Sequence, residues 1–154
     1  MITMKKVTAI LFLSAALSSC FLFSKYKRTD FTYNKGSQSY TIPVVVPKGF
    51  VKERTEVDSS GNTILSYVYK NNALFYIAHL EDTTTQVQPI AESENQPRVN
   101  SITGALVYKG LDSFNLYWRE VRRNDLRFGY RFVPKEWEVR FDSATNYGIV
   151  QRLK

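Results

Sequence analysis

The stretch at residues 63–80, TILSYVYKNNALFYIAHL, constrains the fold more than any other part of the chain. Its two halves are rich in aromatic and β-branched residues, and Asn71 and Asn72 lie between them. Because asparagine tolerates the positive φ angles of a tight turn, the stretch predicts two antiparallel strands joined at these asparagines. A two-residue loop would pair Tyr67 with Tyr76. Both faces then carry apolar groups, which indicates a hairpin in the middle of its sheet.

A second hairpin is predicted at residues 113–134, SFNLYWREVRRNDLRFGYRFVP. A three-residue loop, Arg123-Asn124-Asp125, gathers the apolar residues on one face, whereas a two-residue loop would mix arginines into that set. We therefore expect the longer loop. The apolar face then carries Phe114, Leu116, Trp118, Leu126, Phe128, Tyr130 and Phe132, and the opposite face carries Tyr117, Arg119, Arg123, Arg127 and Arg131.

The remaining segments fit a strand-rich chain. Pro43 and Pro47 restrict the β-branched run YTIPVVVPKGF to an edge strand or an irregular extended segment. In the tail, residues 137–141 alternate like a strand, and Asp142 is a candidate cap for a short helix. The sequence predicts a mainly β fold, an antiparallel sheet built from hairpins, either as a sandwich or as an open barrel-like sheet. An α+β fold with one short C-terminal helix is the variant we expect if the tail is helical.

A long polar segment interrupts the strand pattern at residues 81–100, EDTTTQVQPIAESENQPRVN. Loops of this length without secondary structure are uncommon in compact domains and are usually functional or disordered. Two interpretations of these residues remain: a mobile flap that covers a binding site, or a disordered segment.

The chain begins with a leader. Lys5 and Lys6 precede the apolar run at residues 7–17, and the small residues Ser18 and Ser19 follow it. This order is typical of a secretory signal, and the apolar run is too short for a membrane-spanning stop-transfer helix. We expect residues 1–19 to be removed as a signal peptide.

The only cysteine of the chain follows directly, and Leu17-Ser18-Ser19-Cys20 resembles the lipobox of bacterial lipoproteins. The resemblance covers the leader and Cys20 alone. It implies cleavage before Cys20, a diacylglyceryl group on its thiol and acylation, typically with palmitate, of its new α-amine. Phe21, in place of an inner-membrane retention aspartate, implies the outer membrane, and the lack of an acidic cluster after Cys20 implies a domain facing the periplasm. A cleaved signal with a free thiol, or an uncleaved anchor, is the alternative.

These features divide the chain of 154 residues into three parts. Residues 1–19 are the signal peptide, residues 20–39 the lipidated cysteine and a tether, and residues 40–154 a single β-rich domain. Lys25, Lys27 and Arg28 lie close to the anchor, where anionic headgroups attract basic side chains.

The formal net charge is +7, from 21 basic and 14 acidic side chains. Losing Lys5 and Lys6 with the leader leaves 19 basic side chains against 14 acidic ones. This balance suits an anionic lipid, glycan or protein surface in the cell envelope. Nucleic acid is not the expected partner, because an exported protein rarely meets it.

No residue pattern indicates a known catalytic chemistry. His79 is the only histidine and has no cysteine or histidine companions, so we expect a structural role and no metal site. The sequence contains no nucleophile-elbow, zinc-protease or phosphate-loop motif, and we expect no cofactor. Five carboxylates lie near aromatic residues, and two of them could act as the catalytic pair of a glycosidase-like enzyme. Ion pairing with arginines explains these carboxylates equally well. They are Glu120, Asp125, Glu136, Glu138 and Asp142.

The candidate binding face consists of Tyr117, Arg119, Arg123, Arg127 and Arg131. Guanidinium groups clamp carboxylates or phosphates and stack on planar groups. The alternative is a solvated face on which the arginines pair with neighbouring carboxylates. We expect a non-enzymatic lipoprotein that binds or helps to assemble another envelope component. An immunity-type lipoprotein that neutralises a toxin is the alternative, and a carboxylate-based hydrolase is less favoured.

Overall fold

The computed structural model describes residues 25–81, 98–100 and 103–150. Two antiparallel sheets and one helix make up this part of the chain, and they confirm the mainly β fold with one C-terminal helix. The smaller sheet pairs β1 (Tyr26–Lys35) with β2 (Gln38–Pro47). The larger one has the order β3 (Phe50–Val57), β4 (Thr63–Tyr69), β5 (Leu74–His79), β9 (Leu126–Val133), β8 (Tyr117–Arg123), β7 (Leu106–Leu111) and β6 (Arg98–Val99), and α2 spans Lys135–Val150.

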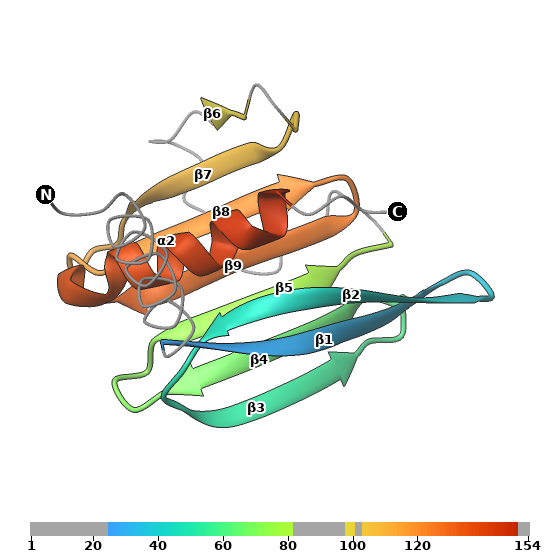
Figure 1. Cartoon of the computed structure of the whole chain (residues 1–154), viewed down its shortest axis with the longest axis horizontal. Coiled ribbons are helices and arrows are strands. Elements are labelled where there is room, and N and C mark those ends of the chain that lie inside the picture. The colour runs from blue at the N-terminus through green and yellow to red at the C-terminus, as the bar shows by residue number, and fades with distance from the viewer. Residues whose placement is uncertain (1–24, 82–97, 101–102, 151–154) are drawn as a thin grey trace, which may run out of the picture.

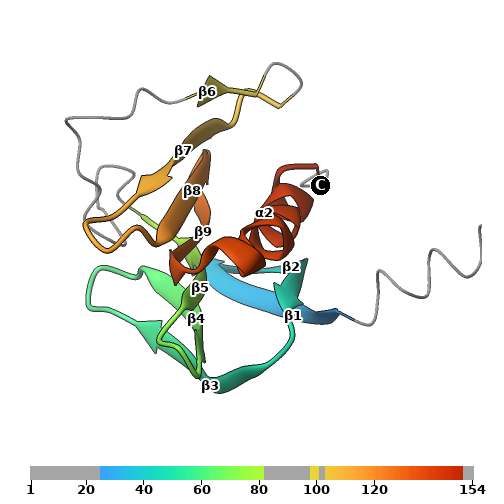
Figure 2. The same ribbon diagram turned by 90° about the vertical axis from the view of Figure 1, so that its left-hand side faces the viewer.

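One face of the seven-stranded sheet is covered by the β1–β2 hairpin and α2, which lie next to each other (Figures 1 and 2). Strict alternation buries Phe31 and Tyr33 of β1 while the residues between and beside them are exposed. This pattern is what a half-buried strand requires. The core also contains Ile42, Val44 and Val46 of β2, Leu65, Tyr67 and Tyr69 of β4, Phe75 and Ile77 of β5, Leu126, Phe128 and Tyr130 of β9, and Phe141 of α2.

The predicted tether is wrong for residues 26–39, because β1 and the start of β2 occupy them. The predicted domain boundary at Tyr40 lies inside β2 and opposite Tyr33 of β1. Charged and polar residues dominate this stretch because only one face of the small sheet is buried. The edge position that the two prolines predict is confirmed, since β2 pairs with β1 alone.

The first hairpin lies where expected, but its register differs by one residue. Tyr67 pairs with Phe75 and not with Tyr76, because the loop has three residues, Lys70–Asn72. Asn72 takes a φ of 63°, the left-handed conformation that closes a loop of this length. The shift sends Tyr76 to the face opposite the core cluster, where it forms part of a polar network described below.

The tail is helical from Lys135, so the predicted strand at residues 137–141 is wrong and the helix begins before Asp142. Trp137, Phe141 and Ala144 follow a helical spacing and pack on the core, whereas Val139 is 76% exposed. Pro134 precedes the helix, and its carbonyl accepts a hydrogen bond from the Trp137 amide at 3.0 Å. A proline at a helix start costs no helical hydrogen bond, which explains why the helix begins here.

The leader, Cys20 and residues 82–97 of the polar segment lie outside the described residues. At the end of that segment, Arg98 and Val99 form the short β6 strand and pair with β7. Within the described ranges no helix is both long enough and apolar enough to cross a membrane.

Candidate functional site

The five residues of the predicted binding face do not share one face. The β8–β9 loop has two residues, Asn124 and Asp125, and Arg123 pairs directly with Leu126. Arg119 and Arg123 therefore lie on the same face as Val121, whereas Arg127 lies on the other face, opposite Arg122. The register that the sequence disfavoured is the one that forms.

Arg119 is buried on the core face, and a helix far away in sequence compensates its charge. Its guanidinium forms an ion pair with Asp142 at 2.9 Å and donates a hydrogen bond to Asn146 at 2.7 Å. Tyr130 donates to the same Asp142 oxygen at 2.7 Å. Arg119 thus joins the sheet to α2, and only 8% of it is exposed to a ligand.

Two further members of the predicted face are engaged elsewhere. A bulge in β9 places both Arg131 and Phe132 between the pairs that flank Trp118. The Arg131 guanidinium lies 5.7 Å from the centre of the Trp118 ring. Tyr117 lies beneath the Lys135 ammonium at 4.7 Å. Neither Arg131 nor Tyr117 lies at the β8–β9 turn.

A cavity of about 580 Å³ opens at the β8–β9 turn, and Arg127 is the one member of the predicted face that lines its described walls. Three cationic and two anionic side chains meet there: Lys35, Arg122, Arg127, Glu81 and Asp125. Leu80, Gly104, Leu106 and Asn124 complete the described lining. This arrangement brings together residues of β1, β8 and the β8–β9 turn at one end of the molecule, and these charged side chains make it a candidate binding site.

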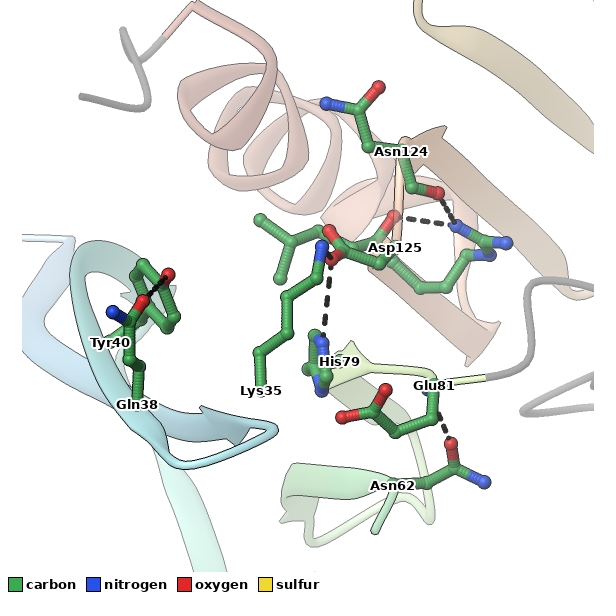
Figure 3. Close-up of polar contacts among 10 residues, drawn as sticks. Lys35, Gln38, Tyr40, Asn62, His79, Glu81, Asn124 and Asp125 are labelled. Atoms are coloured by element: carbon green, nitrogen blue, oxygen red, sulfur yellow. Dashed lines mark hydrogen bonds and ion pairs between the residues drawn. The ribbon is translucent and has the colours of Figure 1, made fainter. Parts of the chain in front are cut away.

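Lys35 and Asp125 form the outer charged pair of this site, with 2.7 Å between Nζ and Oδ2 (Figure 3). Burial favours the neutral form of Asp125, but the hydrogen bond and charge of Lys35 outweigh this effect and hold its pKa below the ordinary value. The same hydrogen bond raises the pKa of Lys35. Both groups are therefore charged at neutral pH.

His79 lies behind this pair and is fully buried. Its ring stacks on Tyr33 with 4.3 Å between the centroids. Its Nε2 lies 3.5 Å from Asp125 Oδ2 (Figure 3). Neither ring nitrogen has a hydrogen-bond partner among the described residues. The buried ring packs on Tyr33 and does not line the cavity, which fits the structural role expected for His79.

Arg127 is held rigidly at the cavity wall. Its Nη1 donates to the carbonyl oxygens of Asn124 at 2.7 Å and Leu126 at 2.9 Å. Burial lowers the pKa of Arg127 below its ordinary value, and the nearby Glu120 opposes that effect. Asn124 takes a φ of 53°, which closes the two-residue turn and aims its carbonyl at the guanidinium.

A buried network supports Arg122 from behind. Glu120 accepts hydrogen bonds from Arg122 Nε and from the Tyr76 hydroxyl, both at 2.7 Å. The Arg122 guanidinium also lies 4.5 Å from the centre of the Tyr108 ring. These contacts fix the base of the Arg122 side chain at the edge of the cavity.

Most of the candidate catalytic carboxylates have cationic partners within 4 Å. Glu120 pairs with Arg122, Asp125 with Lys35, Glu138 with Lys135 and Asp142 with Arg119. Among the described residues no group of three histidine, cysteine or acidic side chains is arranged to hold a metal ion. The pairing fits the ion-pair interpretation of these carboxylates.

Sequence reasoning missed Lys35 and Arg122 of this site. Lys35 comes from a strand ninety positions before Asp125. The sequence signal that could have found it is Gly36, a glycine between the two alternating runs that form β1 and β2. In the structure Gly36 closes this hairpin with a φ of 58°. Comparison of the chain with models of protein families, with curated proteins and with solved structures gave no match.

Proposed function

We propose that this chain is a lipid-anchored protein of the bacterial cell envelope, on the outer membrane and facing the periplasm. Its domain acts without catalysis and binds an acidic side chain of a partner protein in the cavity at the β8–β9 turn. The anchor is supported by the resemblance of Leu17-Ser18-Ser19-Cys20 to a lipobox. The binding site is supported by the convergence of Lys35, Arg122 and Arg127 on one cavity.

The charges of the cavity favour an anionic group with a neighbouring donor. Among its described lining residues the cations outnumber the carboxylates by one. The Lys35 side chain is 57% exposed and Arg122 25%, so their free donors are within reach of a partner. Both are already oriented by Asp125 and Glu120, and a pre-oriented cation loses little rotational freedom when it binds a carboxylate. Glu81 and Asp125 supply acceptors for a donor on the same partner.

A site-specific photocrosslinker tests the binding site. Asn124 at the cavity and Asn72 in the β4–β5 turn are both exposed and both have positive φ, so the same replacement strains them similarly. We expect a specific protein adduct from position 124 in intact cells and none from position 72. Lys35→Glu should abolish the adduct, whereas Lys52→Glu, which changes an exposed lysine on β3, should leave it intact. An adduct that survives Lys35→Glu would contradict binding through this cavity.

The anchor is tested separately. Cys20→Ser should eliminate the incorporation of labelled palmitate, because the thiol that carries the diacylglyceryl group is gone. Ser19→Ala keeps a small residue before the cysteine and should keep the label. Unchanged labelling of Cys20→Ser would show that the cysteine is not the attachment point.

A further inference from the structure

The described chain enters the domain at the same end as several of its turns. The Lys48 amide donates to the Lys25 carbonyl at 2.9 Å, and the Tyr69 hydroxyl donates to the Pro47 carbonyl at 2.6 Å. Tyr69 also contacts Trp137, in the first turn of α2, with 6.1 Å between ring centres. The β2–β3, β4–β5 and β7–β8 turns and the start of α2 therefore share one end of the molecule, which faces the viewer in Figure 2. We call it the entry end.

The entry end combines exposed lysines with exposed apolar side chains. Lys48, Lys70 and Lys135 are exposed in the β2–β3 turn, the β4–β5 turn and the first turn of α2. Phe114, in the β7–β8 turn, is 79% exposed, and Leu111 at the end of β7 is 50% exposed. Basic side chains next to exposed aromatic ones are typical of surfaces that lie against anionic lipid headgroups.

Among the described residues, three carboxylates also lie at this end, against four lysines when Lys25, which is exposed at the chain entry, is counted with Lys48, Lys70 and Lys135. Glu138 pairs with Lys135 at 3.0 Å, and Glu136 is exposed beside it. Asp112 is the third carboxylate, and its Oδ1 accepts hydrogen bonds from the amides of Phe114 and Leu116.

Two turns with the same hydrogen bonds, at opposite ends of the domain, show what is special about Phe114. In the β7–β8 turn Asp112 Oδ1 accepts from the Phe114 amide at 2.8 Å, and in the β3–β4 turn Asp58 Oδ1 accepts from the Ser60 amide at 2.8 Å. The backbone hydrogen bonds of the two turns also correspond one to one. The turn itself therefore does not require an aromatic residue. The exposed phenylalanine occurs at the entry end, and the equivalent position at the far end is a serine.

Phe132 supplies a second exposed phenylalanine, close to the same end, in the β9 bulge. It is 40% exposed and has a φ of 57°, a left-handed conformation that is strained for a bulky residue. Glycine or asparagine would relieve that strain, so stability alone does not account for phenylalanine here.

The position of the lipobox cysteine decides what these side chains face. Lys25 lies five residues after Cys20, and an extended chain of that length spans no more than about 18 Å. A domain on so short a connection holds its entry end close to the bilayer. We propose that the entry end, with Phe114 at its tip and Lys48, Lys70 and Lys135 around it, docks on the anionic headgroups of the membrane that carries the anchor. This inference rests on the lipid anchor of the proposed function.

Depth-dependent quenching in the lipidated full chain tests the proposal. Phe114→Cys and Ser60→Cys each introduce one exposed thiol in matching turns, and an environment-sensitive fluorophore is attached to it. The proteins are reconstituted into vesicles of phosphatidylethanolamine and phosphatidylglycerol that contain nitroxide-labelled lipid. We expect a blue shift and strong quenching at position 114, and neither at position 60. Lys48→Glu combined with Lys70→Glu should reduce the quenching at position 114, as should vesicles of phosphatidylcholine alone.

The outcomes separate this surface from the anchor. Vesicle flotation of the labelled protein with equal quenching at both positions, or with none at position 114, overturns the docking surface and leaves the anchor intact. Quenching at position 114 that neither headgroup charge nor the lysine substitutions alter overturns the assignment to anionic lipid. Failure of the protein to float at all contradicts the anchor of the proposed function, and the docking surface with it.

Discussion

Gly129 lies directly beneath the ring of Tyr76, and a Cβ atom at position 129 would overlap that ring. The two residues are paired across β5 and β9, and Gly129 is also opposite Glu120 of β8. The absence of a side chain on Gly129 lets Tyr76 cross β9 and donate its hydroxyl hydrogen to Glu120. One glycine thus makes room for the hydrogen bond that supports Arg122 at the cavity.

Gly129→Ala should destabilise the protein by about 1–3 kcal/mol, the usual cost of overpacking a buried site. The loss should appear as a lower midpoint of urea unfolding. In a Tyr76→Ala background the same substitution should cost much less, because the overlapping ring is gone. Equal costs in the two backgrounds would show that Tyr76 is not the group that needs the space.

Arg119→Ala should act through stability and not through ligand binding. It removes one partner of a largely buried ion pair and leaves Asp142 with an uncompensated charge, at a cost of about 3 kcal/mol in the free energy of unfolding. Lys27→Ala is the matched control, since it breaks an exposed pair with Glu53 and should cost less than about 1 kcal/mol. A small effect of Arg119→Ala on unfolding, together with loss of the crosslink at position 124, would contradict this prediction and indicate that Arg119 contributes to binding.

Stability should fall in alkaline solution because the core contains buried tyrosines. Burial raises the pKa of Tyr67 to about 12 and raises that of Tyr76 well above its ordinary value. The stability that these hydroxyls contribute is fully present below the unfolded pKa of about 10 and is lost as the pH rises toward the folded values. Urea midpoints measured at about pH 9 and about pH 11 should decrease, and Tyr67→Phe should make the decrease smaller. A midpoint that stays constant over this range would contradict the burial of ionisable hydroxyls in the fold.

Local patterns predicted the strands and the hairpin positions, because alternation and turn residues act over a few positions. They did not predict either register. At Asn71-Asn72 the difference is one residue in loop length, which decides whether Tyr67 faces Phe75 or Tyr76. In the second hairpin, the rule that arginines avoid an apolar face was overruled by Asp142 and Asn146, which reach Arg119 from α2. No local pattern contains that information.

The helix start was missed because residues 137 and 141 suit both an alternating and a helical period, and only packing against Tyr69 and Phe75 selects the helix. The cavity was predictable only in part. Arg127 was among the candidate binding residues and Asp125 among the candidate carboxylates. Lys35 was assigned to a tether, and its contact with Asp125 depends on how the β1–β2 hairpin lies across the large sheet.

On the docking proposed above, the length of β1 sets how far the cavity stands from the membrane surface. The strand begins at the entry end and ends at Lys35, and ten residues of extended chain measure about 33 Å. A domain docked by its entry end therefore presents the cavity at a standoff comparable to the thickness of a bilayer core. On that proposal, a partner confined to the plane of the membrane would not reach that height, whereas a protein that extends into the periplasm would. If the domain docks as proposed, the length of a single strand would favour a partner that extends away from the membrane surface.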